Sequence, residues 1–463
     1  MPEPWAAREF AGAELPDPRF RTSVTNNAEN LASNTGASYS AAVGHGGRQA
    51  ARRLYKNERT TVQGLIKGHV QQTAARCAEH ELVLCIQDTT ILDYSHHRSK
   101  TGLGPISSND YSRGLLAHSV LAVTPDGLPL GVLGLNIWAR EECETPKRLS
   151  KRERETSEKE SGKWLQGLHA VNDALAPSQA VLMVQDREAD VFDLLAEPRR
   201  AHTHLLIRAC HPRRVQLVDA EQSGEPALTN LIDAIEQAPI AAEMLVEVPR
   251  KPGQPSREAC LSVQFRSMRV LPPVNGIHRR KTPQEITVIR VIESEPPQGV
   301  PPICWILACT MPVRTVQDAK TMVRYYSLRW TIERLHFTLK SGCFSVEKVQ
   351  INHGHALINA LAVFYVVAWR VLYLTHLART NPNDPAEQVL SGTELTVLRA
   401  ASKRPVECIA DAFREIACLA GHEHYANAPQ PGVKRIWQGL RILENLTMGW
   451  QLATTAHTTS KSR

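Results

Sequence analysis

The chain has 463 residues, of which 42% are hydrophobic and 22% charged, and its formal net charge at pH 7 is +7. This length allows two or three domains with cores of their own, and the basic excess permits a polyanionic partner without requiring one. The ten cysteines form no CxxC pair, which disfavours a zinc site and is typical of reduced, intracellular thiols. The first residues lack a secretion signal, so we expect a cytoplasmic protein.

Residues 1–70 carry short helical patterns and form the first predicted domain. Arg52, Lys56 and Arg59 are spaced i, i+4 and i+7, so one helix face is predicted to be cationic. A DNA-binding face and an ordinary solvated helix both fit this pattern.

Two short apolar runs each end in an aspartate. "ELVLCIQD" ends at Asp88 and "AVLMVQD" ends at Asp186. Such runs predict strands whose carboxylates lie at the C-terminal edge of a sheet, where open α/β sheets bind ligands. The alternative is that each Asp only caps the following turn or helix.

The segments around these runs predict a hairpin, a solvated stretch and a β insertion. "HSVLAVTPDGLPLGVLGLNIW" is a hairpin sequence with its turn at Pro125–Gly127. The charged run 147–164 is predicted to be solvated before it enters a helix near Trp164. Residues 205–312 alternate β-like segments with Pro- and Gly-rich breaks, which predicts a mainly antiparallel insertion.

The stretch "YYSLRWTIERLHFTLK", residues 325–340, predicts one amphipathic helix. At about 100° per residue, its apolar face consists of Leu328, Ile332, Leu335 and Leu339. A second stripe, roughly 60° wide by the same period, gathers Tyr326, Arg329, Glu333 and Lys340. The alternative is a solvated face whose Arg329–Glu333 pair adds about 0.2–0.5 kcal/mol. The next apolar stretch, 356–374, contains Asn359 and Arg370 and predicts a buried helix rather than a membrane span.

Three carboxylates in these positions suit divalent-metal chemistry. Mg²⁺ prefers hard oxygen ligands, and two such ions support phosphoryl transfer by stabilising the attacking and leaving oxygens. Arg329 and Lys340 suit phosphate contacts, and Tyr326 is able to donate to a phosphate oxygen.

These motifs together resemble those of a known family. "QDTT" at 87–90, "QDREAD" at 185–190 and the spacing Tyr326-x2-Arg329-x3-Glu333-x6-Lys340 resemble the DDE transposases of bacterial insertion sequences. The branch resembled is the Y-R-E-K, or insertion-sequence-four, family, which includes the Tn-five-type cut-and-paste enzymes. The segments "ESGKW" at 160–164, "IRACHPRR" at 207–214 and "WAAREFAGAELPD" at 5–17 extend the resemblance over most of the chain.

The resemblance implies an α/β, RNase H-like catalytic core at 71–375 with the β insertion at about 205–312. It implies flanking helical domains, an N-terminal one that binds DNA ends at 1–70 and a C-terminal one that dimerises at 376–463. Asp88, Asp186 and Glu333 would be the catalytic ligands of Mg²⁺ or Mn²⁺, with two ions bound. The implied DNA contacts are Tyr326, Arg329, Lys340, Trp305, Trp330, Arg208, His211, Arg213, Arg52 and Lys56.

Some of these DNA contacts have ordinary alternatives. Trp305 is implied to stack a base flipped at the transposon end, and Trp330 to wedge that end. Trp305 equally suits a core position beside Ile303 and Ile306. Arg208, His211 and Arg213 equally suit a solvated cationic loop.

The function implied is transposition. A bacterial, nucleoid-associated homodimer would bind inverted-repeat ends, cleave them through a hairpin, and join the 3′ ends to target DNA. Two alternatives remain open from the residues alone. One is a DNA-binding protein descended from a transposase that no longer cuts, and the other is an RNase H-like nuclease without strand transfer.

Overall fold

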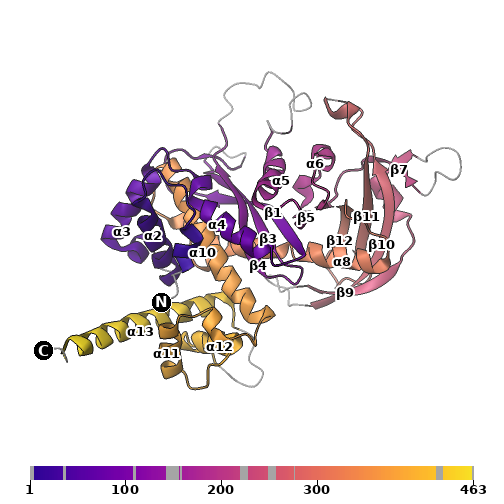
Figure 1. Ribbon diagram of the computed structural model, residues 1–463. Helices are drawn as coiled ribbons and strands as arrows, with labels where there is room; N and C mark the ends of the chain where they lie inside the picture. The colour runs from indigo at the N-terminus through magenta and orange to yellow at the C-terminus, as the bar shows by residue number, and fades with distance from the viewer. Residues whose placement is uncertain are drawn as a thin grey trace. The chain divides into compact units, whose positions relative to one another are not determined.

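The computed structural model describes residues 5–34, 38–107, 111–141, 156, 159–218, 228–248, 257–275, 277–423 and 431–460. The chain divides into two compact units (Figure 1). The first comprises 1–79, 89–142 and 331–463, and the second comprises 80–88 and 143–330. Most of the charged run predicted at 147–164 lies outside the described residues.

Helices form the N-terminal part of the first unit, as predicted. They are α1 (Trp5–Phe10), α2 (Phe20–Ser33), α3 (Tyr39–Lys56) and α4 (Val62–Cys77). Side chains cap two of them, because Ser38 accepts from the Ala41 amide and Thr61 from the Gly64 amide. Since α4 crosses residue 70, the predicted domain boundary falls inside a helix.

The long helix α10 (Gly354–Thr380) is the buried helix that the apolar stretch 356–374 predicted. It contacts α2, α3 and α4 and strand β4 within the first unit. Its length and composition would also allow it to cross a membrane, but 83% of its most apolar window is buried, as in a core helix. The predicted boundary at 375 falls inside α10.

The hairpin predicted within 118–138 is confirmed. Strands β3 (Arg113–Val123) and β4 (Pro129–Trp138) pair antiparallel, and β2 (Gly104–Pro105) adds to β3. The turn closes where the Leu128 carbonyl accepts from the Thr124 amide and Gly127 takes a φ of 102°, a region that favours glycine.

The C-terminal region is helical, as predicted. Its helices are α11 (Gly392–Ala401), α12 (Ile409–Leu419) and α13 (Val433–Ser460). Leu395, Leu398, Ile416 and Leu443 form one of its apolar clusters.

The second unit is a mixed α/β structure. Strands β5 (Ala180–Gln185) and β6 (Thr203–Arg208) run parallel to the first half of β1 (Leu82–Asp93). Helices α5 (Gly162–Ala174) and α6 (Phe192–Ala196) belong to the same unit. The run ending at Asp88 was predicted to be a whole strand; that prediction is wrong, because β1 continues to Asp93.

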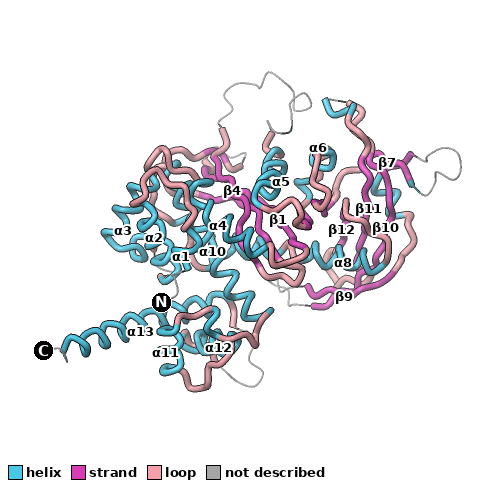
Figure 2. The backbone as a smooth tube through the Cα atoms, viewed as in Figure 1, coloured by secondary structure: helices cyan, strands magenta, loops and turns pink. Residues whose placement is uncertain are grey.

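An antiparallel insertion extends this sheet, as predicted. It begins after β6, where β12 (Cys304–Cys309) pairs antiparallel with β6. The sheet continues through β11 (Gln284–Glu293), β10 (Arg257–Val270), β7 (Arg214–Leu217) and β8 (Leu228–Asn230), and β9 (Ala242–Val248) pairs with β10. Figure 2 shows β7, β9, β10, β11 and β12 in magenta. The short helix α7 (Leu231–Glu236) also belongs to the insertion.

Candidate active site

Asp88 and Asp186 occupy equivalent positions on neighbouring parallel strands. The register of β1 with β5 pairs Leu84 with Leu182 and Ile86 with Val184. Continued by two residues, it places Asp88 beside Asp186, with both side chains on the same face because the side-chain period of a strand is two. The extended backbone of Asp186 (φ −85°, ψ −168°) is consistent with this continuation.

A guanidinium approaches this pair of acids. Arg329 Nη1 lies 3.7 Å from Asp88 Oδ2, and both side chains are 16% exposed. Arg329 also lowers the pKa of Asp186 electrostatically. One cation from the end of helix α8 (Val316–Ser327) therefore acts on both carboxylates.

Asp186 has a capping role as well as its place in the pair. Its Oδ1 accepts from the Glu188 amide at 2.9 Å, which caps the short helix η2 (Arg187–Ala189). Burial raises the pKa of Asp186 above its ordinary value, against the opposing effects of that hydrogen bond and of nearby cations. The capping alternative from the sequence is thus correct for Asp186.

Lys163 is a member of this site that the sequence did not single out. It lies on α5 with its side chain 5% exposed, donates to Glu188 Oε2 at 2.8 Å and also lowers the pKa of Asp186. The signal was present in the segment "ESGKW", whose basic residue falls in the first turn of α5. A buried ammonium beside a half-buried carboxylate with a raised pKa is a recurrent feature of functional sites.

Tyr326 packs beneath Arg329 and not on a solvated stripe. It is buried, and its ring meets that of Trp305 edge-on, with centroids 5.2 Å apart. Burial raises the pKa of the Tyr326 hydroxyl, so it remains a proton donor at neutral pH. Arg208 acts on the same hydroxyl electrostatically and donates to the Cys304 carbonyl at 3.0 Å.

The single helix predicted at 325–340 is wrong. Helix α8 ends at Ser327, α9 spans Trp330–Phe337, and a π-turn, η5, spans Thr338–Gly342. The polar stripe is therefore not one straight row, although the apolar face is buried as predicted at Ile332, Leu335 and Leu339.

Glu333 and Lys340 belong to the first unit, whereas Asp88, Asp186, Tyr326 and Arg329 belong to the second. Glu333 is half-buried on α9. Lys340 Nζ donates to the Ile91 carbonyl at 2.8 Å and lies 3.4 Å from Glu347 Oε1. The ammonium thus already has two partners within its unit.

The remaining predicted contacts of the second unit differ in accessibility. Trp305 is half-buried against Tyr326, while Trp330 is 40% exposed with the Arg329 guanidinium 5.9 Å from its ring. Arg213 binds Asp190, and the amides of Cys210 and His211 donate to the same carboxylate. The side chain of His211 is exposed.

Asp190, Cys210 and His211 also bring ligand atoms within 4.8 Å of one another, a spacing that a metal ion would accept. However, Asp190 already accepts two backbone amides and an arginine. These bonds order the loop after β6, and the group is better explained as structural than as a metal site.

The pair formed by Asp88 and Asp186 fits a divalent cation. Its donors are hard carboxylate oxygens, and one of them carries a raised pKa because burial leaves its charge incompletely balanced. A cation of the Mg²⁺ type would supply that balance.

In the N-terminal helices, Arg52 and Lys56 line a pocket on α3. Helix α3 ends at Lys56, so Arg59 lies beyond the predicted cationic face. Arg48 takes its place one turn before Arg52 on the same face.

Comparison with known proteins bears on this N-terminal segment. Residues 2–60, which hold α1 to α3, match the family model described as transposase DNA-binding. The match supports a DNA transposase. It also supports DNA as the partner of the segment in which a DNA-binding domain was predicted. Among solved structures, the chain is similar to the cryo-EM structure of a piggyBac transposase synaptic complex with hairpin DNA, at 8% identity and a TM-score of 0.34. That similarity covers 87% of this chain and 61% of the other, and so spans less than two thirds of the matched protein.

Proposed function

We propose that the protein is a cut-and-paste DNA transposase of the Y-R-E-K type, built on an RNase H-like DDE core. The proposal is carried by the parallel register of β1 with β5, which when continued by two residues sets Asp88 beside Asp186, and by Arg329, which lies 3.7 Å from Asp88. The match of residues 2–60 to a transposase DNA-binding model supports DNA as the partner, and we propose that the substrate is double-stranded DNA.

Asp88 and Asp186 would hold Mg²⁺ or Mn²⁺, and we assign Glu333 as the third acid from its four-residue spacing after Arg329. Divalent ions held there would supply the Lewis acidity that phosphoryl transfer requires, with two ions the usual arrangement. The carboxylates themselves bind and orient, and their spacing on rigid strands limits the loss of order on binding.

The cationic and aromatic groups near these acids would position the DNA end. Arg329 would engage a phosphate oxygen as a fork, and the protonated Tyr326 hydroxyl would donate to another. Lys340, Arg208, His211 and Arg213 would add backbone contacts. Trp305 and Trp330 would stack on or wedge a base extruded as a hairpin forms, which returns about 1–3 kcal/mol per stacked base.

We further propose a homodimer that pairs two transposon ends in the bacterial cytoplasm, at the nucleoid. Helix α13 supports this proposal because it exposes Leu446, Met448, Trp450 and Leu452, each more than 40% accessible. By helical spacing, Leu446 and Trp450 lie on one side of α13 and Met448 and Leu452 on the other, and large exposed apolar side chains are typical of a protein interface.

The test is a cleavage and strand-transfer assay on duplex DNA carrying the sequences that flank the gene, with Mg²⁺ or Mn²⁺. Hairpinned ends and joined products are expected. Asp88→Asn and Asp186→Asn should each abolish cleavage while retaining end binding. Asp173→Asn provides the matched control, because Asp173 is exposed on α5 and outside the site.

The reaction products distinguish this proposal from its alternatives. Nicks without joined products would identify a nuclease, and binding without any cut would identify a DNA-binding protein. Full activity in either Asp variant would remove that residue from the metal site.

A further inference from the structure

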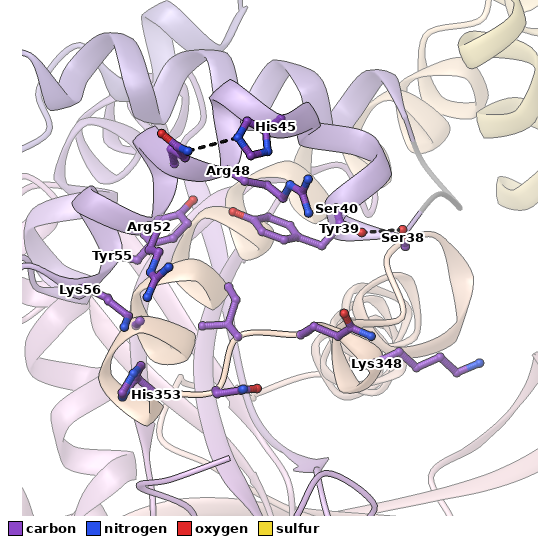
Figure 3. Close-up of a pocket in the computed structure, with 15 residues that line it drawn as sticks. Ser38, Tyr39, Ser40, His45, Arg48, Arg52, Tyr55, Lys56, Lys348 and His353 are labelled. Carbon is purple, nitrogen blue, oxygen red and sulfur yellow. Dashed lines mark hydrogen bonds between the residues drawn. The ribbon is translucent and has the colours of Figure 1, made fainter. Parts of the chain in front are cut away.

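A cationic pocket lies at α3, within the first unit (Figure 3). Its volume is about 680 Å³, and two segments far apart in the sequence line it. One is helix α3, and the other is the stretch from Lys348 to Ala356, at the start of α10. The basic groups that line the pocket are His45, Arg48, Arg52, Lys56, Lys348 and His353.

The wall of the pocket that α3 forms begins at a kink in that helix. Gly44 takes φ 66° inside α3, a conformation that favours glycine, and the helix resumes directly after it. From there His45, Arg48, Arg52 and Lys56 recur at three- and four-residue steps, which places them on one face. Figure 3 shows Arg48, Arg52 and Lys56 on this helix, across the pocket from the segment with Lys348 and His353.

The opposite wall is fixed by backbone contacts. Lys100 Nζ donates to the carbonyls of Val349 (2.5 Å) and Ile351 (2.8 Å). The Thr101 amide donates to the Asn352 carbonyl at 2.8 Å. These bonds fix the backbone of residues 349–352 beside the pocket.

The two walls are also tied to each other. The Asn359 amide on α10 donates to the carbonyls of Tyr55 (3.0 Å) and Thr60 (3.1 Å), at the end of α3. His355 Nε2 bonds the Asn57 carbonyl at 3.1 Å. The pocket is therefore preformed, which reduces the entropy that a ligand must lose on binding.

The lining has a chemistry of its own. The described residues that line the pocket include two arginines and two lysines but no aspartate or glutamate. The amide side chains of Gln49, Gln350 and Asn352 and the ring of Tyr39 complete it. An uncompensated set of cations with amide donors and acceptors suits a phosphate joined to a hydrogen-bonding group such as a nucleobase.

We propose that this pocket binds a nucleotide of a single DNA strand, with its phosphates between the α3 cations and Lys348. A duplex offers its backbone to a protein from one side, whereas here basic groups line opposite walls of a cavity. The volume is within the range of about 300–1,000 Å³ typical of small-ligand pockets. Basic grooves with an aromatic ring are the usual means of holding unpaired strands. This inference rests on the proposed function only for where the single strand comes from. Binding of a nucleotide by the pocket does not depend on transposase activity.

The experiment is fluorescence anisotropy on the full chain without divalent cations, so that no cleavage is needed. The probes are a 5′-labelled octadeoxynucleotide, the same sequence as a duplex, and deoxynucleoside triphosphates as unlabelled competitors. We expect the single strand to bind more tightly than the duplex of equal length. Arg52→Ala and Lys348→Ala should each weaken it about fivefold or more and reduce the log–log salt slope by about 0.7.

Arg53→Ala is the matched control, because Arg53 is the exposed neighbour of Arg52 but does not line the pocket. Its affinity should stay within twofold of the wild type. Equal losses in Arg53→Ala and Arg52→Ala would overturn the proposal, since they would indicate diffuse attraction by the helix. An unchanged Lys348→Ala, or a duplex bound as tightly as the strand, would overturn it as well.

The competitors separate the two sources of a nucleotide. Displacement of the strand only by other oligonucleotides supports a DNA strand, whereas displacement by triphosphates at similar concentration supports a free nucleotide in the same pocket. If the variants behave as expected but the wild type neither cleaves nor joins DNA, the pocket stands and the proposed transposase activity fails.

Discussion

The register of β1 with β5, continued two residues past Ile86 and Val184, sets Asp88 of β1 beside Asp186, which directly follows β5, and Arg329 Nη1 lies 3.7 Å from Asp88 Oδ2. Burial raises the pKa of Asp186, and the nearby carboxylate of Glu188 raises it as well. Arg329 and Lys163 oppose this effect in part, but the pKa of Asp186 stays above its ordinary value. A site organised in this way is less stable than it would be with one charge removed, as is common where binding of a cation is the function.

Asp186→Asn is expected to stabilise the cation-free protein by about 1 kcal/mol, because a neutral amide replaces a half-buried carboxylate whose pKa is raised by burial and by Glu188. Asparagine caps helices about as well as aspartate, so the cap on η2 is retained. Asp186→Ala should lose that cap and gain less. Thermal unfolding with and without Mg²⁺ measures both effects, with Asp173→Asn as control. A lower Tm for Asp186→Asn without Mg²⁺ would contradict the expected cost of the ionised Asp186 carboxylate.

Two substitutions at Tyr326 distinguish a packing role of its ring against Trp305 from a phosphate contact of its hydroxyl. Tyr326→Phe keeps the buried ring and its edge-on partner, so stability should change by less than about 1 kcal/mol. Tyr326→Ala removes the ring and should cost about 3–5 kcal/mol. If the hydroxyl donates to a phosphate, Tyr326→Phe should weaken binding of a DNA end in a gel-shift assay. End binding equal to that of the wild type would confine Tyr326 to packing.

Lys340 contacts the Ile91 carbonyl and Glu347, so its substitution can distinguish a role in DNA binding from a role in stability. If it contacts a phosphate, Lys340→Ala should lower the log–log salt slope of end binding by about 0.9. If Lys340 instead mainly stabilises the fold by binding the Ile91 carbonyl and Glu347, Lys340→Ala should leave the salt slope unchanged and lower the Tm. Glu347→Gln is the companion variant, because it weakens the internal pair and leaves the ammonium in place. A slope unaffected by Lys340→Ala would remove Lys340 from the DNA contacts.

Trp450 on α13 tests the proposed homodimer. Its side chain is 46% exposed, and Trp450→Ser should shift the dimer–monomer equilibrium toward monomer by tenfold or more if it is buried between protomers. Light scattering after size exclusion, with and without end DNA, measures the mass. Arg435→Ser serves as the control, because Arg435 is exposed on the same helix. A wild-type chain that stays monomeric on end DNA would contradict the dimer.

The elements that the sequence predicted well are those with a strong local signal. The turn at Gly127, the alternating strands of the insertion and the apolar stretch that became α10 are each determined by nearby residues. The pairing of Asp88 with Asp186 was anticipated only because both follow similar apolar runs. Their shared register depends on β1 pairing with β5 across about a hundred residues, which local patterns do not contain.

The failures have physical causes as well. Helical periodicity from 325 to 340 continued through Leu328 and Arg329, and no glycine or proline marked the end of α8. The charge of Asp88 interrupts an apolar run and so predicts a strand end, whereas β1 continues through Asp88 to Asp93. The sequence did not indicate Lys163 or Lys348, because local patterns do not show that Lys163 pairs with Glu188 or that Lys348 lines a pocket with residues of α3.

Glu9 provides a pH test of the DNA-binding segment itself. Its carboxylate is buried on α1 and bonds two residues of α4, His69 Nδ1 at 2.5 Å and Arg76 Nη1 at 2.7 Å. The Val132 amide donates to His69 Nε2, so the imidazole is neutral and carries its proton on Nδ1, toward Glu9. Burial alone would raise the pKa of Glu9, but the bonds from His69 and Arg76 outweigh it and lower that pKa to about 2.

Because the folded pKa of Glu9 is below its ordinary value of 4.5, the stability it contributes is present above pH 4.5 and is lost as the pH falls toward 2. The difference corresponds to roughly 3 kcal/mol. Urea unfolding followed by circular dichroism should show this loss in the wild type between pH 4.5 and 3. Glu9→Gln should be less stable at pH 7 and should flatten that part of the profile, whereas Glu14→Gln, on the exposed surface, should leave it unchanged. A Glu9→Gln profile parallel to that of the wild type would show that another group causes the acid sensitivity.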